Sequence, residues 1–114
     1  MNFDVDVLMD RVKMLKNWRI WVGKVAEVVG TLLPGARVYV IGSVVRGDYV
    51  AGSDVDVLIV SEHVPDRLVE RSRLKVAIED GLKLPYYHPF EFHLVKPEEA
   101  EIYLRRAGED ILEV

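Results

Sequence analysis

Two aspartates, Asp54 and Asp56, stand at the start of an apolar run that ends at Val60. Ionised side chains beside a buried segment are costly unless something binds them. Side chains alternate faces along a strand, so the two carboxylates should point to the same side, roughly 6–7 Å apart. Such a pair can share Mg²⁺, which prefers one or two carboxylates together with phosphate oxygens. The pattern indicates a metal site; an exposed Asp-x-Asp turn that solvates the entry to a strand is the alternative.

A Gly-Ser pair, Gly42 and Ser43, follows another apolar segment directly, and ten residues separate it from Asp54. Glycine lets the backbone approach a ligand closely, and neighbouring amides can point at an anion. The Ser43 hydroxyl adds a donor for a phosphate oxygen. An ordinary tight turn would explain the Gly-Ser pair alone. The combination with Asp-x-Asp is more specific and predicts a site for a cation and phosphates.

The spacing of apolar residues predicts the elements that position these groups. Apolar residues recur every three or four positions from Asp4 to about Leu32, which predicts a long amphipathic helix. At about 28 residues it exceeds the usual length, so we expect a break near Lys16-Asn17 or an overhang beyond the body. The β-branched run Val55–Val60 predicts a strand buried on both faces. The other expected elements are strands over 37–41 and 90–95, a helical turn near 44–46, helices over about 65–81 and 97–106, and an edge strand over 111–114.

Length and element order define the class of fold. The 114 residues suffice for one small domain, residues 1–114, with a single core. Strands that alternate with helices predict an α/β (α+β) layered architecture. The absence of cysteine excludes disulfides, thiolate zinc sites and a cysteine nucleophile.

Charge and hydropathy narrow the partners and the location. A net charge of −4 argues against nucleic acid as the main ligand. No apolar run approaches the roughly 20 residues that cross a bilayer. The start, Met1 to Asp4, lacks the positive and apolar character of a secretory signal, so we expect a cytoplasmic protein. The lack of glutamine and the presence of only two asparagines favour a thermophilic source.

Three short motifs together match a known pattern: Gly42-Ser43, Arg46-Gly47-Asp48 and Ser53-Asp54-Val55-Asp56. In these motifs the chain resembles the DNA polymerase beta-like nucleotidyltransferases. Its short length points within them to the minimal nucleotidyltransferases of prokaryotes (the MNT type), which are antitoxin partners of HEPN-domain toxins. The resemblance implies a small mixed sheet of three to four strands, with helices packed mainly on one face.

The resemblance also implies a third carboxylate on a later strand, and Glu91, between two phenylalanines, occupies that place. The implied catalytic and metal-binding set is then Asp54, Asp56 and Glu91, with Glu91 as the candidate base. A solvent-facing strand residue is the alternative for Glu91. His93 lies two residues further on the same face. It could bond a site carboxylate or the base of a nucleotide, or have only a structural role.

The implied nucleotide-binding residues lie in and around the Gly-Ser loop: Gly42, Ser43, Arg46 and Ser53. Arg46 could contact the triphosphate, or it could bond Asp48 and brace the loop. Many relatives have an arginine near the position of Val44, so the phosphate cradle is expected to be less positive here.

Several aromatic and histidine side chains have two open interpretations. Trp18 and Trp21 could pack on the sheet or cover a partner. The loop at residues 86–88, Tyr-Tyr-His, could stack a base or fill the core or surface. His63 has no motif behind it.

The resemblance implies a reaction. Two Mg²⁺ ions about 3.5–4 Å apart, or Mn²⁺ in their place, would bind at the carboxylates. ATP or another NTP would donate its nucleoside monophosphate to a hydroxyl and release pyrophosphate. The implied acceptor is a tyrosine of a HEPN toxin, bound as a partner chain. The alternatives are a non-catalytic antitoxin with a vestigial site and, less favoured, an aminoglycoside-type nucleotidyltransferase. Both a homodimer and a hetero-oligomer stay open.

Overall fold

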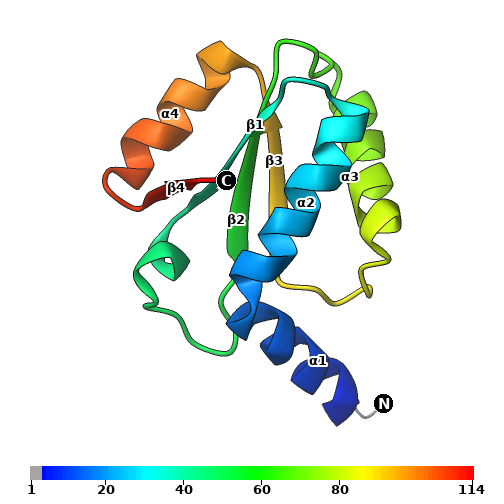
Figure 1. Ribbon diagram of the computed structural model, residues 1–114, viewed down its shortest axis with the longest axis vertical. Helices are drawn as coiled ribbons and strands as arrows, with labels where there is room; N and C mark the ends of the chain where they lie inside the picture. The colour runs from blue at the N-terminus through cyan, green and yellow to red at the C-terminus, as the bar shows by residue number, and fades with distance from the viewer. Residues whose placement is uncertain (1–3) are drawn as a thin grey trace.

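A four-stranded mixed sheet organises the computed structural model, which describes residues 4–114 (Figure 1). The strand order is β3–β2–β1–β4. The strands are β1 (Arg37–Ile41), β2 (Val55–Val60), β3 (Phe90–Val95) and β4 (Ile111–Glu113). Strand β1 runs antiparallel to β2 and β4, whereas β2 and β3 are parallel. The expected small mixed α/β fold is confirmed.

Helices cover both faces of this sheet, and Figure 1 shows α4 on one side with α2 and α3 on the other. The helices are α1 (Val5–Lys16), α2 (Trp18–Leu32), α3 (Leu68–Leu82) and α4 (Pro97–Ala107). The main core lies between the sheet and α2 and α3, where Val57 and Ile59 are fully buried. A smaller core on the other face joins Leu58 and Val95 to Ala100 of α4. Since Asp56 and Leu58 alternate with Val57, Asp56 faces the α4 side.

The long N-terminal helix breaks at Asn17, as the sequence predicts. The Asn17 side-chain amide donates to the carbonyl of Lys13 at 2.9 Å, and α2 starts at the next residue. In Figure 1, α1 projects beyond the sheet, so the expected overhang is present as well. Trp18 is buried, and the ring of Trp21 lies 6.4 Å from that of Phe90, so both tryptophans belong to the core.

Other boundaries need correction or lie outside the described part. Helix α3 begins at Leu68 and not at Pro65, because the backbone at Arg67 is still extended and Pro65 uses its carbonyl to accept a hydrogen bond from Arg71. The first three residues, on which the expectation about a secretory signal partly rests, lie outside the described residues. Within residues 4–114, no helix combines the length and apolar character needed to cross a bilayer.

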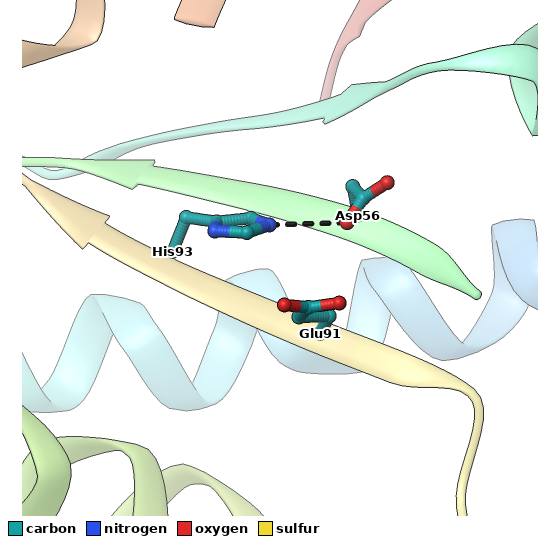
Figure 2. Close-up of side chains that lie close together, drawn as sticks. All are labelled: Asp56, Glu91 and His93. Atoms are coloured by element: carbon teal, nitrogen blue, oxygen red, sulfur yellow. Dashed lines mark hydrogen bonds and ion pairs between the residues drawn. The ribbon is translucent and has the colours of Figure 1, made fainter.

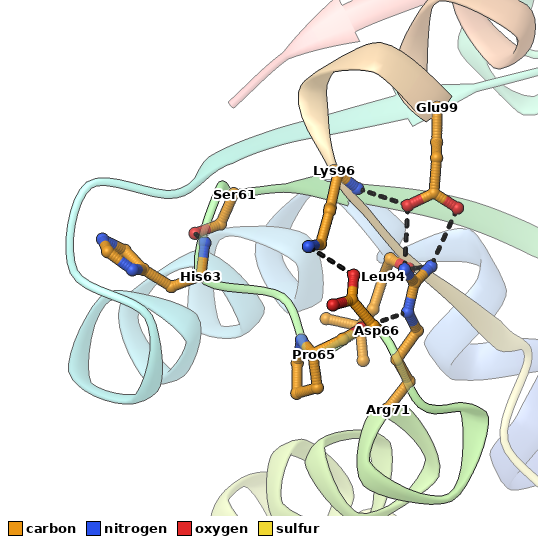
Figure 3. A network of polar contacts seen from close by, with 8 residues as sticks. All are labelled: Ser61, His63, Pro65, Asp66, Arg71, Leu94, Lys96 and Glu99. Carbon is orange, nitrogen blue, oxygen red and sulfur yellow. Dashed lines mark hydrogen bonds and ion pairs between the residues drawn. The ribbon is translucent and has the colours of Figure 1, made fainter.

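An ion-pair network attaches the start of α4 to α3 (Figure 3). Arg71, whose side chain is 13% exposed, donates to both carboxylate oxygens of Glu99, at 2.9 and 3.0 Å. It also donates to the carbonyls of Pro65 and Leu94. Lys96 pairs with Asp66 beside it. These contacts fix the direction in which α4 crosses its face of the sheet.

Acid is expected to weaken this attachment. The side-chain hydrogen bond from Arg71 and the backbone N–H of Lys96 hold the pKa of Glu99 below its usual value. Because the folded pKa is lowered, the stabilisation is complete above the unfolded pKa of about 4.3 and is lost as the pH falls through the folded value. When the pH falls from about 5 to about 3, the free energy of unfolding should drop less in Glu99→Gln than in the parent. The difference should be only about 0.5–1 kcal/mol, since the carboxylate is partly exposed. Urea unfolding at several pH values measures this difference.

A matched control for that measurement is Glu101→Gln, at an exposed position of the same helix. The parent and the Glu101 variant should show the same acid dependence. Equal acid dependence in the Glu99 variant and the parent would contradict the prediction.

Candidate functional site

Asp56 and Glu91 are direct partners in the register between β2 and β3, and they share their surface with His93 (Figure 2). The candidate ligand atoms of these three residues all lie within 4.8 Å of one another. The Nε2 atom of His93 lies 3.0 Å from Oδ1 of Asp56. Glu91 is exposed, and the side chains of Asp56 and His93 are 38% and 22% exposed. The cluster is therefore accessible, and its two carboxylates suit a hard divalent cation.

The parallel pairing of β2 with β3 explains why these residues meet. The parallel register places Glu91 opposite Asp56, and alternation along β3 places His93 on the same face. Residues 35 and 37 positions apart in the chain therefore meet. The sequence prediction that Glu91 joins Asp56 agrees with this geometry. Of the two interpretations of His93, a bond to a site carboxylate is the one that the geometry supports.

Asp54 lies just before β2, and its carboxylate is engaged by an arginine that was not predicted from the sequence. Arg11 of α1 donates through Nη2 to Oδ1 of Asp54 at 2.8 Å. The same guanidinium donates to the carbonyls of Ala51 and Ser53, each at 2.9 Å. The Arg11 side chain is only 5% exposed, whereas that of Asp54 is 57% exposed. Asp54 is thus held by α1 and is not part of the close cluster of Asp56, Glu91 and His93.

The sequence did contain a signal for Arg11. Arg11 lies three residues after Leu8 and four before Leu15, so a cation occupies the apolar stripe of the predicted helix, and the structure buries it with Met14 and Leu15. Arginine is almost never buried unless it is paired. A buried partner for Arg11 could therefore have been predicted, although not its identity.

The Gly-Ser loop lies beside Asp56. Gly42 has φ +96°, a conformation that side chains rarely adopt, and a Cβ atom at this position would lie 3.7 Å from Oδ2 of Asp56. Ser43 is exposed and begins a short 3₁₀ turn, Ser43–Arg46, where the helical turn was expected. Val44 packs into the main core at 2% exposure. The side chain at position 44 therefore points away from Asp56.

Arg46 and Ser53 use their side chains to hold the loop. Arg46 pairs with Asp110, before β4, and lies 3.6 Å from Asp48. The Ser53 hydroxyl accepts a hydrogen bond from the backbone N–H of Val50 at 3.0 Å. These contacts agree with the loop-bracing interpretation of Arg46. Nucleotide binding by either residue stays a prediction.

His63 and the loop at residues 86–88, which the sequence singled out, are not members of the cluster. His88 pairs with Glu79 at 2.6 Å, and its ring lies 6.0 Å from that of Phe90, so it fills space beneath α3. The guanidinium of Arg11 lies 5.0 Å from the ring centre of Tyr87. Tyr86 and His63 are exposed.

Helix α4 forms the far wall of the site. A cavity of about 300 Å³ is lined by residues of β1, the Gly-Ser loop, β2, β3 and α4: Ile41, Gly42, Asp56, His93, Tyr103, Arg106 and Ala107. The rings of His93 and Tyr103 lie 5.3 Å apart at 47°. No functional residue was predicted on this helix, because the sequence motifs end at Asp56.

Comparison with known proteins fits this geometry. A family model for the nucleotidyltransferase domain matches residues 22–111, which include β1, β2, β3 and α4, end at the first residue of β4 and leave out Arg11. A crystal structure of a protein provisionally named a nucleotidyltransferase is 31% identical, with a TM-score of 0.61 over 82% of this chain and 96% of that chain. A similarly named protein from Sulfolobus solfataricus is 22% identical, with a TM-score of 0.56 over 99% of this chain and 89% of that one, and supports the fold alone. No curated protein sequence matches the chain significantly.

Proposed function

Since this chain belongs to the nucleotidyltransferase domain family, we propose that it transfers AMP from ATP, with Mg²⁺, to a hydroxyl group of a partner protein. The observation that carries the proposal is the convergence of Asp56, Glu91 and His93 beside the Gly42 loop. A glycine loop whose amides can meet phosphate oxygens, next to paired carboxylates, suits a metal-bound nucleotide.

The residues can be given roles in this reaction. Asp56 and Glu91 would hold the cation, Asp54 would join them if its carboxylate exchanged Arg11 for the metal, and Mn²⁺ would fit the same oxygen atoms. When bound, the cation neutralises charge on the phosphate oxygens and lowers the pKa of the incoming hydroxyl. The amides and the hydroxyl at Gly42-Ser43 would bind phosphate oxygens. His93, bonded to Asp56, keeps that carboxylate in a fixed orientation.

The proposed chemistry is an in-line displacement. The acceptor hydroxyl oxygen forms a bond to the α-phosphorus, the bond from that phosphorus to the bridging oxygen of the β-phosphate breaks, and pyrophosphate leaves. Glu91, which is exposed and adjacent to Asp56, would accept the proton of the hydroxyl. Fixed positioning and charge neutralisation would supply most of the rate enhancement.

The acceptor that we propose is a tyrosine on a HEPN-domain toxin, which makes this chain its antitoxin. The support is the resemblance of the motifs to the minimal nucleotidyltransferases. Apolar side chains are also exposed on the first two helices, with Val5, Met9 and Ile20 each more than half exposed. Such side chains offer contact area to a partner chain.

One observation favours a second candidate, an antitoxin that acts by occlusion alone. The guanidinium of Arg11 already neutralises Asp54, which belongs to the implied metal-binding set. A site with one carboxylate engaged in this way could bind a partner without turnover.

Label transfer distinguishes the two candidates. Incubation with α-phosphate-labelled ATP, Mg²⁺ and the product of the neighbouring gene should label that product, and EDTA or the double substitution Asp54→Ala with Asp56→Ala should abolish labelling. A toxin neutralised equally well by the doubly substituted protein, without label, would establish occlusion. No transfer to any supplied acceptor would contradict the enzymatic proposal.

A further inference from the structure

We propose that Arg106, on α4, is the cation that binds the polyphosphate of the nucleotide in this protein. The inference rests on the proposed function and adds to it a specific substrate-binding residue. Three features of the cavity between α4 and the Gly-Ser loop support it. The wall opposite α4 is negatively charged, the other nearby arginines are already paired, and α4 is held in place at both ends.

The wall of the cavity opposite α4 carries an excess of negative charge. Asp56 lines it, Glu91 pairs with Asp56 in register, and the Gly42-Ser43 loop contributes only neutral donors. A triphosphate placed over Gly42 brings several more negative charges. A bound cation would offset part of this charge, and enzymes that move phosphoryl groups commonly add an arginine or lysine clamp.

The arginines that the loop and α1 could offer are already used. Arg46 is paired with Asp110 and lies near Asp48, and Arg11 is buried against Asp54. Val44, in the same loop, has its side chain in the core. An arginine at position 44 could therefore not face the cavity without a rearrangement of the loop.

Arg106 lines the cavity together with Gly42 and Asp56, is exposed, and forms no ion pair with any residue between 4 and 114. Tyr103, Arg106 and Ala107 lie at i, i+3 and i+4, so one face of α4 is turned to the site. A planar guanidinium can bind two phosphate oxygens at once. Arg106 thus has the position, the charge and the freedom to meet a polyphosphate over Gly42-Ser43.

The attachment of α4 at both ends keeps this arginine in place. Arg71 and Glu99 fix the first turn of the helix to α3 (Figure 3). Past the last turn, Asp110 pairs with Arg46, and its carbonyl accepts the backbone N–H of Gly42 at 3.0 Å. The segment after α4 is therefore hydrogen-bonded to the same glycine that the phosphates would approach. Because the helix and the loop are already fixed, nucleotide binding would lose less entropy from ordering them.

Nucleotide binding, measured apart from turnover, tests the proposal. Titration calorimetry with Mg²⁺ and α,β-methylene ATP should show about tenfold weaker binding for Arg106→Gln than for the parent, since a charge-assisted bidentate contact is lost. Arg106→Lys should fall between them. Adenosine, which has no phosphate, should bind equally to the parent and to Arg106→Gln, and so should Mn²⁺ alone.

The control variant is Arg105→Gln, which removes the same charge from an adjacent exposed position outside the cavity. Triphosphate binding by Arg106→Gln at the parental affinity, or equal weakening in both variants, would overturn the role of Arg106 while the proposed function stands. If the parent itself binds no nucleotide in the presence of Mg²⁺ or Mn²⁺, the proposed function fails and this inference fails with it. Circular dichroism of each variant verifies that it is folded.

Discussion

Asp56→Asn is expected to reduce nucleotidyl transfer by about 10²–10³-fold or more, the range seen when one fixed electrostatic group is removed from an active site. The residue occupies the centre of the candidate site: it faces Glu91 in the strand register, bonds His93 at 3.0 Å and lies beside Gly42. Asparagine keeps the shape and one acceptor oxygen but removes the charge that a divalent cation requires. The substitution should therefore affect metal binding and turnover far more than the fold.

Two measurements on purified protein check this expectation. Label transfer from α-labelled ATP reports turnover, and Mn²⁺ titration followed by electron paramagnetic resonance reports metal affinity. Asp80→Asn, at an exposed position near the end of α3, is the matched control and should behave as the parent does. Parental Mn²⁺ affinity in the Asp56 variant would show that the cation binds elsewhere.

The strands were predictable because their signals are local. The β-branched run of β2 and the glycine and proline residues around β1 define their own boundaries within a few residues. The break at Asn17 also has a local cause, since its side chain competes for the carbonyl of Lys13. The start of α3 was misplaced because Pro65, a common helix starter, instead serves as an acceptor for Arg71.

Two kinds of signal made site residues predictable: alternation of side chains along one strand, and the motif pattern of the family. His93 follows from alternation, two residues after Glu91, whereas the choice of Glu91 came from the resemblance. The contact of Arg11 with Asp54 joins residues 43 positions apart, and it depends on the overhang of α1. The position of Arg106 beside Gly42 depends on how α3 anchors α4. Neither contact has a local sequence signal that names its partner.

Arg11→Met is expected to lower the free energy of unfolding by about 2–3 kcal/mol, because it removes charge-assisted hydrogen bonds from a buried side chain. The contact with Asp54 contributes only part of this loss, since that carboxylate is 57% exposed and screened by solvent. The larger part comes from the carbonyls of Ala51 and Ser53, which lose their bonds to Arg11. Urea unfolding gives the value, and Lys13→Met, at an exposed position of the same helix, should change stability by less than about 0.5 kcal/mol.

Asp54→Asn separates the structural role of this contact from the chemical one. Asparagine can present an acceptor oxygen to Arg11, so the variant should keep most of the stability that Arg11→Met loses. It should nevertheless lose metal-dependent transfer if Asp54 contributes its charge to the cation. Equal stability losses in the two variants would mean that the ion pair, and not the bonds to the backbone carbonyls, stabilises the loop. Parental transfer by a folded Asp54→Asn protein would instead leave Asp56 and Glu91 as the carboxylates that bind the metal, with Asp54 serving to hold α1 against the loop.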